Sequence, residues 1–314
     1  MTGTIAFTRG DHVWVMRADG SGQRRLARGD GPAWSPDGRR IAFEVGVNEY
    51  PSLIYVVDVD GSGLRRLTRR EQAYDRHSSP VWSPDGKTIA FEGYNDGNHW
   101  INVVGADGSG QRELSQRGGP YLDVAPVWSQ DGRSIMFTKL SDDAVYAMRR
   151  DGSGRRVVGR VDGEDGRGVV WSPDRRRITV LIGADLWMLT AEGRRLVRLF
   201  QSPMDKRENW GGIAWAPDGR TIAFSVVEGK GEDAESEIYV VNADGDGLRK
   251  LTDNARGDDV GPIWSRDGRA IAFMSNRDGN SEIYVMNADG SDQRNLSRSL
   301  KDEFVFDWSL RMMP

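Results

Sequence analysis

Residues 80–93 read PVWSPDGKTIAFEG, and closely similar phrases recur along the whole chain of 314 residues. Successive tryptophans of this phrase are separated by 48, 46, 43, 44, 49 and 44 residues. A period in this range is typical of the four-stranded blade of a β-propeller. The tryptophans that mark the seven repeats are Trp34, Trp82, Trp128, Trp171, Trp215, Trp264 and Trp308.

Each repeat contains four short runs of apolar and β-branched residues, which we interpret as strands A to D. Examples are PVW (80–82) for strand A, TIAFE (88–92) for B, IYVVDVD (54–60) for C and LRRLT (64–68) for D. Gly, Asp, Pro and Ser lie between these runs, as turns require. The A–B and C–D turns hardly vary and should share one face of the ring, the turn face. The B–C and D–A loops vary and should form the opposite loop face, where we expect the functional site.

The seventh repeat is divided between the two ends of the chain. FVFDWS (304–309) supplies its strand A and TIAFT (4–8) supplies its strand B. Pairing these segments would close the ring and leave no blade with an unpaired inner edge. The sequence therefore predicts an all-β chain that forms one domain over residues 1–314. This domain is a seven-bladed propeller whose last blade combines N-terminal strands B to D with C-terminal strand A.

The repeats have the form P-x-W-S-P-D-G-x-x-I-A-F, then E-I-Y-V-M-N-A-D-G, then R-x-L-T, and residues 262–297 follow it closely. In these motifs the whole chain resembles the TolB-like propeller family, whose repeats are WD-like repeats of the PD type. The resemblance implies a propeller fold. The family includes periplasmic binding proteins, peptidase gating domains, sugar-acid lyases and sensor domains, and a fold does not by itself determine a function.

Composition excludes several classes of site. The chain has no cysteine, so it has neither a disulfide framework nor a thiolate metal site. Its formal net charge is −4, which does not favour nucleic-acid binding, and no apolar run is long enough for membrane insertion. The N-terminus enters a strand at once, so we expect a cytoplasmic protein as written, or a periplasmic or extracellular one if leading residues have been removed.

The segments that depart most from the repeat lie around blade two. They are the loop RREQAYDRHSS (69–79) and the predicted B–C loop GYNDGNHW (93–100). Aromatic, carboxylate and imidazole side chains together suit a pocket for a polar, ring-bearing ligand such as a sugar. The candidate ligand-binding residues, with their neighbours from blades one and three, are Tyr50, Tyr74, Asp75, Arg76, His77, Tyr94, His99, Trp100, Tyr121 and Asp123.

Two glutamates, Glu44 and Glu92, follow the phenylalanine of strand B in adjacent blades. We count both as candidate ligand-binding residues, because neighbouring carboxylates near the channel could share a proton or bind a cation. Alternatively, each could accept backbone hydrogen bonds between blades. A channel-bound divalent cation such as Ca²⁺ is possible, with Asp258, Asp259 and Glu303 as weak candidate ligands. We predict no other cofactor.

No nucleophile elbow, HExxH motif, phosphate-binding loop or histidine-rich ligand set is present. We therefore hypothesise a non-catalytic, monomeric module that binds a protein segment or a small polar ligand at its loop face and channel mouth. The alternative is a carbohydrate-active lyase or hydrolase with its site in the loops of blades one to three. In that enzyme His77 or His99 would be the base, Asp75 or Asp123 its orienting partner, and Arg76 would stabilise charge.

Overall fold

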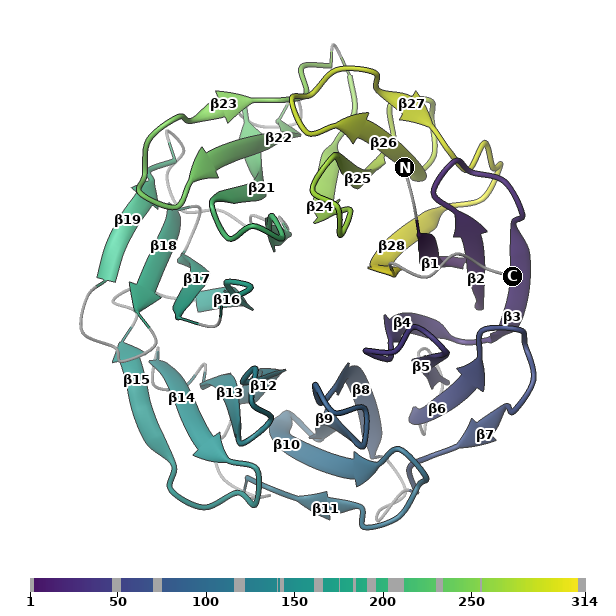
Figure 1. Ribbon diagram of the computed structural model, residues 1–314, viewed down its shortest axis with the longest axis vertical. Helices are drawn as coiled ribbons and strands as arrows, with labels where there is room; N and C mark the ends of the chain where they lie inside the picture. The colour runs from purple at the N-terminus through teal and green to yellow at the C-terminus, as the bar shows by residue number, and fades with distance from the viewer. Residues whose placement is uncertain are drawn as a thin grey trace.

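The computed structural model shows seven four-stranded antiparallel sheets arranged in a ring (Figure 1), and we call the region along the axis of this ring, beside the innermost strands, the channel. The structure describes residues 3–46, 52–69, 75–115, 122–139, 141, 144–160, 166–174, 176–182, 185–190, 196–202, 212–229, 234–254 and 256–309. Within these residues, no helix is long and apolar enough to cross a membrane. The prediction of a seven-bladed propeller is confirmed.

In six blades the strands run in chain order from the channel outward, and in blade seven the C-terminal strand is innermost and the three N-terminal strands follow it. Blade one contains β4 (Asp30–Trp34), β5 (Arg40–Val45), β6 (Leu53–Asp58) and β7 (Arg65–Arg66). Blade two contains β8 (Arg76–Trp82), β9 (Thr88–Asn95), β10 (Asn98–Gly105) and β11 (Arg112–Glu113). Blade three contains β12 (Asp123–Trp128), β13 (Ser134–Lys139), β14 (Ala144–Arg149) and β15 (Arg156–Arg160). Blade four contains β16 (Gly166–Trp171), β17 (Arg177–Ile182), β18 (Asp185–Thr190) and β19 (Leu196–Phe200).

The remaining blades complete the ring. Blade five contains β20 (Ile213–Trp215), β21 (Thr221–Glu228), β22 (Glu235–Asn242) and β23 (Arg249–Lys250). Blade six contains β24 (Asp259–Trp264), β25 (Ala270–Ser275), β26 (Glu282–Asn287) and β27 (Arg294–Asn295). Blade seven contains β28 (Glu303–Ser309), β1 (Thr4–Arg9), β2 (His12–Arg17) and β3 (Arg24–Arg28).

The A–B turns are built by side-chain chemistry as well as by glycine. In blade one, the Ser35 hydroxyl donates to Asp37 (2.6 Å) and accepts the N–H of Arg40 (2.9 Å). Gly38 closes this turn at a φ of 64°, which a residue with a Cβ adopts only at a cost. The same serine–aspartate pair recurs at Ser83–Asp85, Ser129–Asp131, Ser172–Asp174 and Ser265–Asp267.

The outermost strands of four blades are shorter than the sequence predicts. In blade one, strand D was expected over residues 64–68, but only Arg65 and Arg66 pair with β6. Thr68 has left the strand, and its hydroxyl accepts the N–H of Ile54 (2.9 Å). A side chain therefore replaces a ladder hydrogen bond at the outer edge, which also keeps that edge short.

The two ends of the chain meet in blade seven, as predicted. Strand β28 pairs antiparallel with β1, and Thr4 lies opposite Ser309 while Arg9 lies opposite Glu303. A β-bulge interrupts the register between Ala6 and Phe7. The ring is thus closed by backbone hydrogen bonds between residues almost 300 positions apart.

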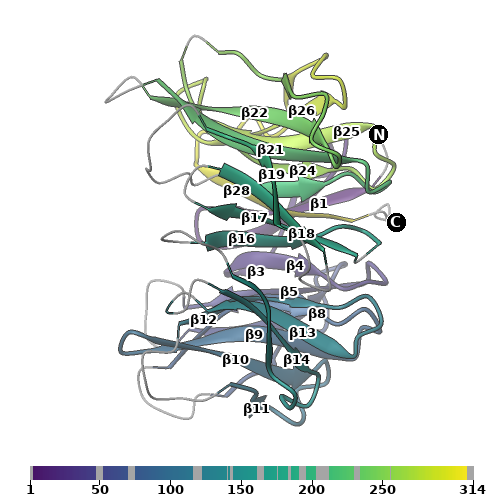
Figure 2. The same ribbon diagram turned by 90° about the vertical axis from the view of Figure 1, so that its left-hand side faces the viewer.

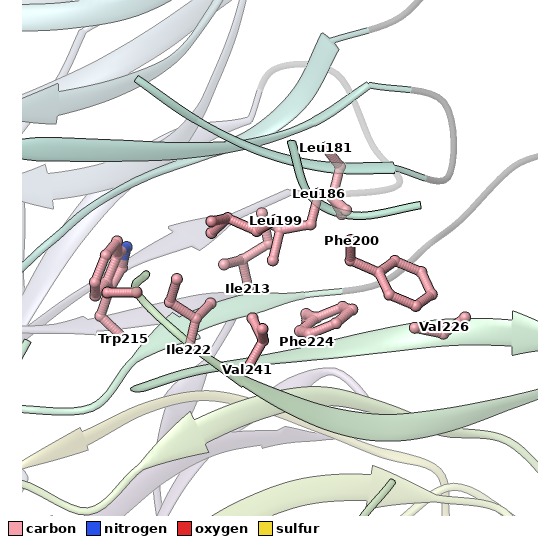
Figure 3. Packing of buried hydrophobic residues seen from close by; sticks show 11 residues of the cluster. Leu181, Leu186, Leu199, Phe200, Ile213, Trp215, Ile222, Phe224, Val226 and Val241 are labelled. Carbon is pink, nitrogen blue, oxygen red and sulfur yellow. The ribbon is translucent and has the colours of Figure 1, made fainter. Parts of the chain in front are cut away.

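The apolar core lies between blades rather than within them. Figure 3 shows one such cluster, in which Leu181 and Leu186 of blade four pack against Trp215 and Phe224 of blade five. Some of the tryptophans also form hydrogen bonds across the boundaries: the indole N–H of Trp82, for example, donates to the Ala33 carbonyl at 3.1 Å. Each blade therefore buries the apolar surface of its two faces against the neighbouring blades.

We expect removal of residues 304–314 to abolish cooperative unfolding, because it strips β28 from β1 and exposes an unpaired edge. Size-exclusion chromatography should show aggregation, and calorimetry should show a broadened or lost transition. A truncated chain that remained monomeric with an unchanged melting temperature would refute the closure of blade seven by β28.

We expect Trp82→Ala to lower the free energy of unfolding by about 3–5 kcal/mol, because it opens a cavity at the boundary of blades one and two. Trp82→Phe should cost less, since it mainly loses the indole hydrogen bond, which contributes about 1 kcal/mol. Urea unfolding followed by fluorescence measures both. Equal effects of the two substitutions would show that volume at this boundary does not matter.

Candidate functional site

The segment predicted as the B–C loop of blade two is a regular hairpin, so the loop assignment is wrong. Strands β9 and β10 pair as far as Asn95 opposite Asn98, and only two residues connect them. Asp96 and Gly97 have φ values of 47° and 80°. Positive φ at both central residues is the signature of a type I′ turn, which suits the twist of paired strands. Figure 2 shows the β9–β10 hairpin extending from the left side of the ring, which is the loop face.

Three of the predicted residues come together on this hairpin. The rings of Tyr94 and His99 are cross-strand neighbours whose centroids lie 4.7 Å apart. Nδ1 of His99 lies 3.8 Å from a carboxylate oxygen of Glu92. All three side chains are partly exposed, so they can contact a ligand at the loop face.

His77 and Trp100, in contrast, are packing residues. We expected both in exposed loops, but each lies in a strand and is only 1% exposed. Nδ1 of His77 lies 3.0 Å from the Thr68 hydroxyl, and its ring meets Phe91 edge-on. Gly93 makes room for Trp100, because a Cβ at Gly93 would lie 2.4 Å from the indole.

The other blade-two candidates lie at the start of the inner strand. Asp75 is fully buried and accepts a hydrogen bond from the Asn95 amide (3.0 Å). Arg76 begins β8, opposite Tyr94, and is partly exposed. The remaining predicted residues, Tyr50, Tyr74 and Tyr121, lie outside the described residues.

Asp123 is fully buried and belongs to a stack of side chains that the sequence did not reveal. Its two carboxylate oxygens accept hydrogen bonds from Arg155 at 3.0 and 3.1 Å. The Arg155 guanidinium in turn lies over the rings of Phe137 and Tyr146, with its carbon 4.8 and 4.7 Å from their centroids. Acid–arginine–aromatic contacts also occur in blades four, six and seven, as Asp185–Arg198–Trp187, Asp259–Arg277–Tyr284 and Glu303–Arg9–Trp14.

These contacts bear on the weak metal candidates. Asp259 and Glu303 are fully buried, and each is paired with an arginine. Asp258 accepts the N–H of Ser236 at 2.9 Å. In the part of the chain that the structure describes, no three Asp, Glu or His side chains are grouped so that they could hold a metal ion. A channel-bound cation therefore stays a prediction without a ligand set.

Glu44 and Glu92 each join their blade to the next one. A carboxylate oxygen of Glu44 accepts the backbone N–H of Ser79 at 2.7 Å, and Glu92 does the same for Ala125 at 2.7 Å. Ser79 and Ala125 both have a φ of 54°, at bulges in the inner strands of blades two and three. The observed contacts of both glutamates thus agree with the alternative that each accepts a backbone hydrogen bond between blades.

Glu44 is also electrostatically unusual. Burial raises its pKa to about 7, and the negative charges of Asp30 and Glu92 add to this effect against the opposing hydrogen bond from Ser79. Asp30 lies directly opposite Glu44 in the β4–β5 pair. The carboxyl group of Glu44 therefore titrates near neutral pH, which is the behaviour expected of a functional acid as well as of a buried one.

A pocket of about 640 Å³ lies along the channel wall beside Glu44. Its lining includes four prolines and two tryptophans, and Glu44, Asp307 and Arg266 supply its charges. Neither Asp307 nor Arg266 is among the site residues predicted from the sequence. Arg266 carried a signal, because it replaces the proline of the S-P-D-G turn, whereas Asp307 lies inside a strand motif. The full lining is Gly31, Pro32, Ala33, Trp34, Pro36, Glu44, Ser79, Pro80, Val81, Trp82, Pro84, Arg266 and Asp307.

The chain has recognisable relatives, each of which it matches over a short segment. It is 41% identical over 66 residues to dipeptidyl-peptidase 5 of Porphyromonas gingivalis, a match that covers 20% of this chain and 10% of the peptidase. It is 35% identical over 98 residues to the Tol-Pal system protein TolB of Anaeromyxobacter dehalogenans, which covers 30% of this chain and 20% of that protein. The matched segments thus span a fifth or less of either relative.

The fold is also found in solved structures. An oligogalacturonate lyase in complex with manganese superposes with a TM-score of 0.63 at 14% identity, covering 93% of this chain and 85% of the lyase. At this identity the likeness shows the fold alone. The family model for the TolB β-propeller domain matches residues 26–211 and 201–311. Since these matches cover most of its length, the chain belongs to the TolB β-propeller domain family.

Proposed function

We propose that this propeller is a non-catalytic binding module that receives a protein segment or a small polar ligand in its channel. The observation that carries the proposal is the pocket of about 640 Å³ with Glu44 on its wall. Its size lies in the range of known ligand sites, and it combines apolar walls with a few charged groups. The hairpin residues Tyr94 and His99 would form a second contact surface on the loop face.

The surroundings of the candidate catalytic residues favour binding over acid–base catalysis. In the described residues, the histidine of the inner strand, His77, is buried against Thr68 and Phe91. Asp123, the proposed orienting partner of a catalytic base, is held by Arg155. A catalytic histidine needs an accessible nitrogen and a carboxylate free to orient it, and neither residue meets this requirement.

The relatives are compatible with this proposal. One of them carries the name of a Tol-Pal system protein and another that of a peptidase. A propeller that presents a channel to a partner segment would suit either setting. The carbohydrate-active alternative now depends on His99 with Glu92, because these are the partly exposed imidazole and carboxylate that lie near each other in blade two.

The raised pKa of Glu44 predicts how the affinity of the proposed binding changes with pH. A cationic group of the ligand would bind the ionised carboxylate, and a pKa of about 7 leaves only a small fraction ionised at pH 6. Apparent affinity scales with the fraction of the binding-competent form. Affinity for a ligand that offers a cation to Glu44 should therefore rise about tenfold between pH 6 and pH 8.

We expect peptides selected from a random phage-displayed library on this protein to carry a basic residue and to need Glu44. Isothermal titration calorimetry should show that Glu44→Gln weakens their binding by at least about 1 kcal/mol and removes its rise with pH. Glu92→Gln is the matched control, because Glu92 occupies the same repeat position and bonds the same type of bulge amide but does not line the pocket. It removes one of the charges that raise the pKa of Glu44, so the rise of affinity with pH should persist in this variant at a lower pH.

Three results would count against the proposal. Selected peptides that bind both variants as well as the parent would place binding outside the channel. Equal losses in the two variants would mean that the glutamates act through the bulges. Turnover of an oligogalacturonate that disappears in His99→Ala but survives in Glu44→Gln would establish the enzymatic alternative.

A further inference from the structure

A second recess lies on the turn face of the ring, whereas the β9–β10 hairpin of blade two extends from the opposite loop face. The turn face looks toward the viewer in Figure 1 and lies on the right in Figure 2. The recess has a volume of about 600 Å³ and is lined by residues of blades one, two and three. Its lining is Arg40, Arg65, Gly86, Lys87, Thr88, Val103, Val104, Gly105, Ala106, Asp107, Ser109, Gly110, Arg112 and Arg150.

The charge of this recess is opposite to that of the protein. Its lining contains four arginines and one lysine but a single carboxylate, Asp107. The five cations less this one anion give a formal charge of +4, whereas the whole chain carries −4. One oxygen of Asp107 also accepts hydrogen bonds from Ser109. A concave surface with one sign of charge concentrates its field and attracts ions of the opposite sign.

Most of the cations are held in place without being neutralised. Arg65 donates to the carbonyl of Ala106 at 2.6 Å, and Arg112 donates to the carbonyls of Arg150 and Asp151 at 3.2 and 3.1 Å. Within the described residues, Arg150 is the member of the five that has a carboxylate in ion-pair range, at 3.2 Å from Asp85. Fixed guanidinium groups lose little entropy when they bind an anion.

Arg150 is a departure from the repeat. The residue before the Asp-Gly or Glu-Gly of the C–D turn is small and apolar in the other six blades, as Ala18, Val59, Ala106, Ala191, Ala243 and Ala288. Blade three alone places an arginine there, and this side chain reaches across to Thr88 and Asp85 of blade two. The turn does not need Arg150, but the recess gains a guanidinium from it.

We infer that this basic recess binds a small phosphorylated molecule with at least two negative charges. Arginine forks match phosphate oxygens in bidentate hydrogen bonds, and a volume of about 600 Å³ accommodates a ligand of metabolite size. Lys87 adds an exposed ammonium group at the rim. The site is independent of the channel pocket, which shares none of its lining residues.

The test uses pyrophosphate as the probe, with calorimetry on the full chain at low ionic strength. We expect binding with a dissociation constant below about 1 mM, weakening as KCl is added because exposed charges are screened. The double variant Lys87→Gln/Arg112→Ala should bind at least about tenfold more weakly, since it loses two charge-assisted contacts.

The chain offers a control with the same change of net charge. Arg269 and Arg294 occupy the positions of Lys87 and Arg112 in blade six, and Arg269 makes the same backbone contact to its turn aspartate as Lys87 does. The double variant Arg269→Gln/Arg294→Ala should bind pyrophosphate as the parent does. Melting temperatures of both variants check that each remains folded.

Several outcomes would overturn the inference. They are the absence of binding by the parent chain at millimolar pyrophosphate, equal weakening in both double variants, and tight binding of a polyglutamate peptide without binding of pyrophosphate. The second would reduce the effect to net charge, and the third would make the recess a surface for an acidic protein segment.

Discussion

The structure depends on the burial of apolar surface between neighbouring blades. Each sheet is narrow, and the strand B residues and tryptophans of one blade find their partners in the next. A single blade therefore has too little core to be stable alone, and a row of blades leaves two faces exposed. Closing the ring through β28 and β1 removes both exposed faces at once. The split repeat is a consequence of this constraint.

Glu44 and Glu92 form hydrogen bonds across two of these blade boundaries. The inner strands bulge at Ser79 and Ala125, and each bulge leaves a backbone N–H that the sheet does not use. The carboxylates of the preceding blades accept hydrogen bonds from these two N–H groups. Glu44 can combine this structural contact with ligand binding, because only one of its oxygens is needed by Ser79.

The repeat made the architecture predictable, whereas the site was only partly so. Trp82 and its equivalents, the turn glycines and the split blade all follow from local spacing and turn chemistry. The structure of residues 93–100 could not be predicted in this way. Gly93 leaves room for the Trp100 side chain, and Asp96-Gly97 forms a tight turn that makes the expected loop a hairpin. The pairing of Asp123 with Arg155 was hidden for another reason. The two residues are 32 positions apart in the chain, and only the folded blade brings them together.

We propose that Glu44 is a partly buried carboxyl group that ionises when a ligand with a basic group enters the channel. Carbon-detected NMR titration of the Glu44 carboxyl group tests it most directly, with Glu44→Gln to assign the signal. We expect a midpoint near pH 7 in the free protein, and we expect this midpoint to fall when a channel-binding peptide with a basic residue is added. A midpoint near 4.5, the ordinary value for glutamate, that the peptide leaves unchanged would contradict it.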